Sequence, residues 1–140
     1  MSYQQLAYAH LATLVPAFVI GTFLLLARKG TPRHKALGKI YMSLMLLTAL
    51  ISLFMPAHLS PPLIGNFGFT HALSVVVMIG VPTAYISIRH GNVAVHRGAM
   101  ISMYVGGLLI AGSLAFRPGR MLNDWLFQGV PGVAQWLGLR

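Results

Sequence analysis

The stretch RKGTPRHKALGK, residues 28–39, is the densest group of charges in the chain and holds five of its ten lysines and arginines. Apolar runs of about 20 residues lie on both sides of it, which is the length needed to cross the hydrocarbon core of a bilayer. A second basic stretch, RHGNVAVHR at residues 89–97, lies between two further apolar runs. The pattern predicts two short basic loops, each joining a pair of membrane-spanning helices.

The overall composition agrees with an integral membrane protein. Hydrophobic residues make up 56% of the 140 residues and charged residues 8%, whereas soluble domains are about one-quarter charged. A net charge of +9 suggests nucleic-acid binding in a soluble protein. Here the cations lie between apolar runs, so anionic lipid headgroups explain them better and no nucleic-acid partner is expected. Because the chain has no cysteine and a single acid, Asp124, thiolate sites and paired-carboxylate catalysis are excluded.

The apolar runs predict an all-α fold, a membrane four-helix bundle formed by one domain that covers residues 1–140. Thr31 followed by Pro32 suits the N-cap and first position of the second helix. Small residues recur along the fourth helix and allow close helix contact, so this helix is expected at the centre of the bundle. The spans are expected at about residues 8–27, 36–55, 69–88 and 98–116, with an interfacial tail at 117–140.

The distribution of cations predicts the orientation of the protein in the inner membrane of the cell. Seven of the ten lysines and arginines lie in the two basic loops, and Arg117, Arg120 and Arg140 lie on the opposite side. Loops rich in lysine and arginine stay in the cytoplasm. The two basic loops are therefore expected to be cytoplasmic, with both termini and the middle loop outside.

An internal repeat relates the two halves of the chain. His10 corresponds to His71, and His34 to His96, at offsets of 61 and 62 residues. Each unit contains two spans, so both copies have the same orientation, and a pseudo-twofold axis along the membrane normal is expected to relate them. The two units cover about residues 8–55 and 69–116.

The repeat also predicts where the histidines lie. His10 and His71 begin odd-numbered spans at the outer face, and His34 and His96 begin even-numbered spans at the inner face. Since alternate helices are diagonal partners in an up-down bundle, each pair can face across the bundle axis. Paired imidazoles in an apolar slot are what a b-type haem requires. The leading hypothesis is a redox protein with one or two haem b groups, ligated by His10 with His71 and by His34 with His96.

Cations near these histidines suit the haem propionates. Arg33, Lys35 and Arg97 adjoin the inner pair, and Arg120 is a further candidate for cofactor binding at the outer face. Together with Arg117, Trp125 and Tyr104, Arg120 also suggests an outer pocket for a quinone or a small anion.

Other interpretations remain open. A histidine at a helix end can cap the helix or contact lipid phosphate, and this applies most to His34 and His96. If the loop residues His58 and His90 join the pairs, three imidazoles gather at each face, which suits Zn or Cu and favours metal binding or transport. The chain can also be an accessory subunit of a larger membrane complex, or a homodimer.

Two resemblances bear on these hypotheses. The layout of the histidines resembles that of transmembrane dihaem b-type cytochromes of the ascorbate-reducing family, which implies haem ligation. Over residues 10 to about 127, the sequence is similar to a bacterial family of uncharacterised four-span membrane proteins, the domain of unknown function 2306, which implies an integral membrane fold and no particular activity. The residues that carry this second resemblance are the HxxLGxxY run at His34, Gly38 and Tyr41, the span-opening His71, the pair His96 and Arg97, and the corner Pro118, Gly119 and Arg120.

Overall fold

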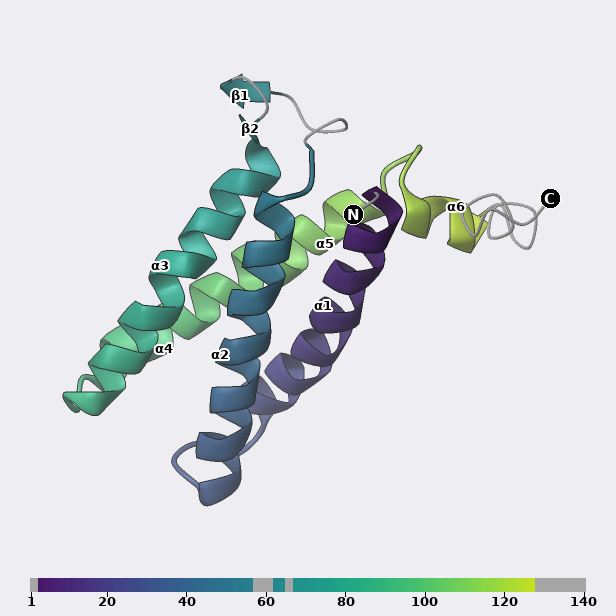
Figure 1. Cartoon of the computed structure of the whole chain (residues 1–140). Helices are drawn as coiled ribbons and strands as arrows, with labels where there is room; N and C mark the ends of the chain where they lie inside the picture. The colour runs from purple at the N-terminus through teal and green to yellow at the C-terminus, as the bar shows by residue number, and fades with distance from the viewer. Residues whose placement is uncertain (1–2, 57–61, 65–66, 128–140) are drawn as a thin grey trace.

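The computed structural model describes residues 3–56, 62–64 and 67–127 and consists mainly of long helices (Figure 1). Four spans in these residues are long and apolar enough to cross a membrane, as the sequence predicts. The fourth span is built from three consecutive segments. The helices are α1 (Tyr3–Leu26), α2 (Pro32–Leu53), α3 (Phe69–Arg89), α4 (Val93–Ser102) continued by the π-helix η1 (Met103–Ile110) and α5 (Ala111–Ala115), and a short α6 (Met121–Phe127).

Local signals set where the helices begin. The hydroxyl of Thr31 accepts a hydrogen bond from the amide of His34 at 3.1 Å, and Pro32 takes the first helical position, which confirms the predicted N-cap of α2. Gly30 has a φ of 80°, a left-handed conformation that glycine adopts at no steric cost. Both α1 and α2 begin four or more residues before the predicted spans. For α2, the capped polar turn at Thr31 extends the helix beyond its apolar run.

The middle loop contains a structure that the sequence did not predict. β1 (Pro62–Ile64) pairs antiparallel with β2 (Phe67–Gly68) immediately before α3. The π-helical segment in the fourth span was also not predicted. Wide turns of this kind are frequent at functional sites, and this one buries the adjacent side chains of Met103 and Tyr104.

The helices form an up-down bundle. α1 packs against α2, α2 against α3, and α3 against α4 and η1, while η1 returns to contact α1. α1 and α3 are therefore diagonal partners, as are α2 and the fourth span. We call the end that holds the two basic turns the hairpin end, and the opposite end, with the middle loop and α6, the terminal end (Figure 1). The relation of the two halves by a pseudo-twofold axis stays a prediction, as does their orientation in the membrane.

In the part of the bundle between its two ends, close packing joins the two helix hairpins. A Cβ atom on Gly21 would lie 2.7 Å from the ring of Tyr41 and 2.9 Å from that of Tyr104. The hydroxyl of Tyr104 also hydrogen-bonds that of Thr22 on α1 at 2.7 Å. Gly107 gives similar room to the side chain of Met45. We call this the packed middle, and its largest fully buried side chains are Tyr41, Met45 and Met103.

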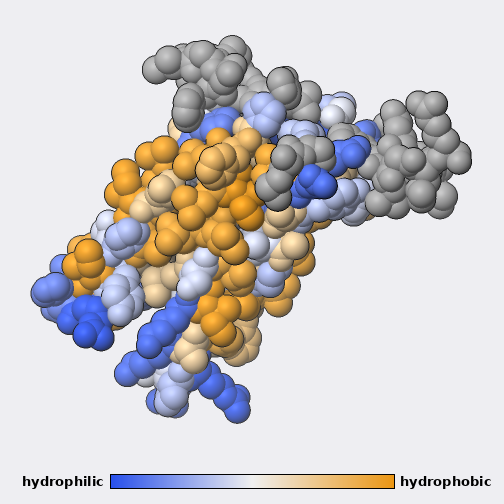
Figure 2. All heavy atoms as spheres, viewed as in Figure 1, coloured by the Kyte–Doolittle hydropathy of each residue, from blue (hydrophilic) through white to orange (hydrophobic). Residues whose placement is uncertain are grey.

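Most of the remaining apolar surface faces outward, as expected for helices in contact with lipid. Figure 2 shows a broad apolar surface over the spans and two hydrophilic lobes at the hairpin end, with a notch between them. The fourth span is less buried than α2 and α3, so the prediction that it lies at the centre is wrong. Of its glycines, Gly107 makes the close contact, whereas Gly98, Gly106 and Gly112 face open space.

We predict that Gly21→Ala destabilises the bundle. The added methyl group would meet two buried aromatic rings, and overpacking of this kind costs about 1–3 kcal/mol, which outweighs the roughly 1 kcal/mol that alanine gains over glycine in a helix. The measurement is thermal unfolding in detergent, followed by circular dichroism. Gly38→Ala is the matched control, because a Cβ at Gly38 meets open space. An unchanged or raised melting temperature for Gly21→Ala would contradict the close packing.

Candidate functional site

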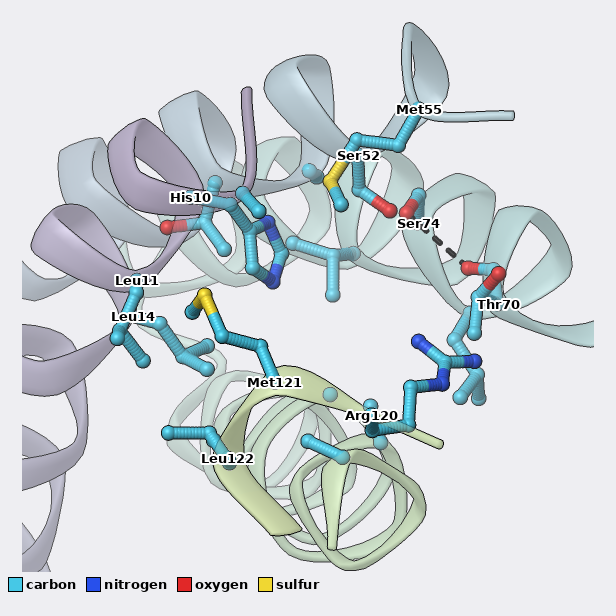
Figure 3. Close-up of a pocket in the computed structure, with 18 of the residues that line it drawn as sticks. His10, Leu11, Leu14, Ser52, Met55, Thr70, Ser74, Arg120, Met121 and Leu122 are labelled. Carbon is cyan, nitrogen blue, oxygen red and sulfur yellow. Dashed lines mark hydrogen bonds between the residues drawn. The ribbon is translucent and has the colours of Figure 1, made fainter. Parts of the chain in front are cut away.

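A cavity of about 150 Å³ lies inside the bundle at the terminal end, between all four spans. Its floor includes Met45, Val77 and Gly107 from the packed middle. Arg120, Met121 and Leu122, at the start of α6, border its opposite side (Figure 3). The polar side chains in its wall are those of Tyr3, His10, Thr48, Ser52, Thr70, Ser74 and Arg120.

A chain of two hydrogen bonds links the backbone of His10 on α1 to Thr48 on α2. The hydroxyl of Thr48 donates to that of Thr13 at 2.7 Å, and Thr13 donates to the carbonyl of His10 at 2.9 Å. Hydrogen bonds between membrane helices contribute about 0.6 kcal/mol each on average. The ring of His10 points into the cavity (Figure 3). Its Nδ1 is buried beside the Thr48 backbone but does not reach hydrogen-bond geometry.

His71 differs from His10 although the sequence pairs them. Its side chain is 5% exposed and does not line the cavity. Its Nδ1 accepts a hydrogen bond from the amide of Gly68 at 3.2 Å, so the ring caps the start of α3. In a neutral imidazole one nitrogen accepts and the other carries the proton, so Nε2 of His71 is the protonated nitrogen. Neither nitrogen of His71 then has a lone pair for a haem iron.

At the hairpin end, His96 has the opposite tautomer. Its Nδ1 lies 2.8 Å from the carbonyl oxygen of Ala84 on α3. A carbonyl oxygen only accepts, so Nδ1 carries the proton and Nε2 keeps its lone pair. A backbone carbonyl that orients a histidine in this way is the usual partner of a metal-bound imidazole.

His34 lies on the diagonal helix at the same end. Its ring is within electrostatic range of His96. Its Nδ1 is buried and has no hydrogen-bond partner in the described residues. An unpartnered buried nitrogen costs free energy, and a bound group can relieve that cost.

The starts of α2 and α4 show that the pair of His34 and His96 is not symmetric. Asn92 caps α4 through a hydrogen bond to the amide of Val95 at 3.1 Å, as Thr31 caps α2. The caps are 61 residues apart, whereas His34 and His96 are 62 apart. One residue turns a side chain by about 100° around a helix, so the two histidines do not occupy equivalent positions relative to their N-caps.

The other sequence-predicted site residues are distributed as follows. Arg33, Lys35 and Arg97 are exposed at the hairpin end, and His90 is exposed there with its Nδ1 2.9 Å from the carbonyl of Ile86. Of the four residues suggested for an outer pocket, Arg120 lines the cavity, whereas Arg117 is exposed, Trp125 packs against Tyr8, and Tyr104 belongs to the packed middle.

The three-imidazole metal sites are not formed by the described residues. In that part of the chain, no three histidine or acidic side chains are close enough to share a metal ion, so His34, His90 and His96 do not come together as a triad. The proposed outer triad includes His58, which lies outside the described residues.

Comparison with known proteins identifies the family. The family described as Predicted membrane protein (DUF2306) matches residues 7–125. The chain belongs to this family. No curated protein and no solved structure matches it. The assignment agrees with the four spans and, since the family has no described activity, leaves function to the chemistry of the two ends.

We predict that His71 and His96 are opposite neutral tautomers. The amide of Gly68 requires an unprotonated Nδ1 in His71, and the carbonyl of Ala84 requires a protonated Nδ1 in His96. Nitrogen NMR shifts of histidine-labelled protein in detergent, at a pH where both rings are neutral, measure this directly. The variants His71→Ala and His96→Ala assign the signals. Finding the same tautomer at both positions would contradict the assignment of the two histidines to different roles.

Proposed function

We propose that this four-span membrane protein is a small redox protein that binds one b-type haem at its hairpin end, through His34 and His96. The sequence suggested one or two haem b groups, one for each pair of histidines. The proposal keeps a single haem, at the hairpin end. At the terminal end the residues do not fit a haem, because His71 gives its Nδ1 lone pair to an amide and its ring lies outside the cavity.

The observation that carries the proposal is the hydrogen bond from Nδ1 of His96 to the carbonyl of Ala84, at 2.8 Å. It fixes the tautomer that ligation needs and directs the ring from α4 towards α3. The buried, unpartnered Nδ1 of His34 on the diagonal helix is a second supporting feature. The notch between the two hydrophilic lobes in Figure 2 is at this end of the bundle.

The surrounding residues suit the charges of such a group. Arg33 and Lys35 flank His34, and Arg97 follows His96, and all three are exposed at the membrane surface. Cations in this position bind carboxylate groups by charge-assisted hydrogen bonds. Neutral imidazoles add no charge to the apolar interior, where an unpaired charge is costly. A haem with two imidazole ligands, when bound, carries single electrons.

The non-haem alternatives are separate outcomes of the same test. A zinc or copper protein would draw on the same two histidines without a third in the described residues, and an accessory subunit would need neither. A redox partner such as a quinone, a homodimer contact and the inner-membrane orientation stay predictions of the sequence.

We predict that the purified protein shows the visible bands of a b-type haem that change on reduction with dithionite. His34→Ala and His96→Ala should each lose these bands, because each removes one ligand. The measurement is the absorption spectrum in detergent, before and after dithionite, of protein expressed with ample haem.

Two controls separate ligation from folding. His90→Ala removes an exposed imidazole at the same end and should leave the bands unchanged. His71→Ala removes a helix cap at the other end and should keep the bands even if it lowers the melting temperature. A colourless wild-type protein would remove the cytochrome proposal, and metal analysis of that preparation would test zinc and copper.

A further inference from the structure

The cavity at the terminal end is not explained by haem binding at the hairpin end. It is lined by residues of the four spans and by the start of α6, and its volume is about 150 Å³. An apolar cavity of that size takes up one benzene-sized molecule. We infer that it binds the ring of a small aromatic molecule that carries an oxygen acceptor, such as a benzoate-like carboxylate or the head group of a quinone.

The apolar part of the wall suits a ring. Its flexible or branched apolar side chains include Leu11 and Leu14 of α1, Leu73 of α3 and Met121 of α6. Burial of apolar surface against these side chains contributes about 25 cal/mol per Å². Shape and size therefore select the body of the ligand, and the polar residues select its head group.

Of the seven polar side chains in the wall, those of His10 and Arg120 carry the nitrogen groups that a ligand can use. Thr48 and Ser74 already donate their hydroxyl hydrogens within the protein, to Thr13 and to the carbonyl of Thr70. In the described residues, the buried Nδ1 of His10 has no hydrogen-bond partner, and the guanidinium of Arg120 makes no hydrogen bond or ion pair. Figure 3 shows His10 on one side of the cavity and Arg120 on another, so a molecule between them can meet both.

The charge of the wall decides the kind of head group. The described lining residues include one guanidinium and no carboxylate, so the site favours an anion or a strong acceptor and disfavours a cation. Arginine binds planar carboxylate oxygens through paired N–H groups, and it also donates to a quinone carbonyl. A plain hydrocarbon would leave these N–H groups without a partner in an apolar surrounding, which is costly.

This inference does not depend on haem, since it uses the opposite end of the bundle and other residues. Three probes test it by calorimetry on the full-length protein in detergent: benzoate, duroquinone and toluene. We predict that benzoate or duroquinone binds at least tenfold more tightly than toluene. Binding of benzoate alone indicates a water-soluble carboxylate as the natural ligand, and binding of duroquinone alone indicates a membrane quinone.

Variants then locate the binding. Arg120→Gln should weaken binding of the oxygen-bearing probe at least tenfold and leave toluene unchanged. Arg117→Gln is the matched control, because Arg117 is three residues away, exposed and outside the cavity. Ala111→Leu fills part of the cavity and should abolish binding of all three probes.

The inference is overturned if toluene binds as tightly as both oxygen-bearing probes, or if none of the three binds. It is also overturned if Arg117→Gln and Arg120→Gln have equal effects, or if Ala111→Leu leaves binding unchanged. Circular dichroism of each variant shows whether its helices are intact, so a loss of binding is compared only among folded proteins.

Discussion

The contact of Gly21 with the rings of Tyr41 and Tyr104 is the packing on which the rest of the bundle depends. Lipid is as apolar as the helices, so membrane helices associate through close packing and hydrogen bonds rather than through burial from water. A Cβ at position 21 would lie within 3 Å of both rings. Glycine therefore lets α1 contact two helices of different hairpins at one point. The hydrogen bond between the hydroxyls of Thr22 and Tyr104 also links α1 to the fourth span.

Because side chains fill the packed middle, the polar groups at the two ends of the bundle form two separate sites. Tyr41, Met45 and Met103 occupy the interior between them. Above this layer is a cavity with an imidazole and a guanidinium, and below it are a pair of imidazoles and most of the cations. This layer therefore separates a ligand or cofactor at one end from the residues at the other.

The sequence was sufficient to predict the four spans. Hydrophobic length determines which segments cross the bilayer, and the Thr31–Pro32 cap is a local signal that depends only on neighbouring residues. The cavity residue Arg120 was also identified from the sequence as a candidate for binding at its face. The contributions of Thr48 and Met121 to that cavity were missed, since nothing in the sequence distinguishes them from other residues of apolar helices.

What the sequence by itself determined is the membrane fold: four apolar runs, joined in pairs by basic turns, have no stable alternative to helices in lipid. Tertiary structure alone decided what each histidine does. His71 and His96 are the same residue type, and each lies in the first turn of a span, yet an amide faces the ring nitrogen of the first and a carbonyl faces that of the second. Whether a nitrogen donates or accepts depends on the atom opposite it, which is a property of packing rather than of residue type.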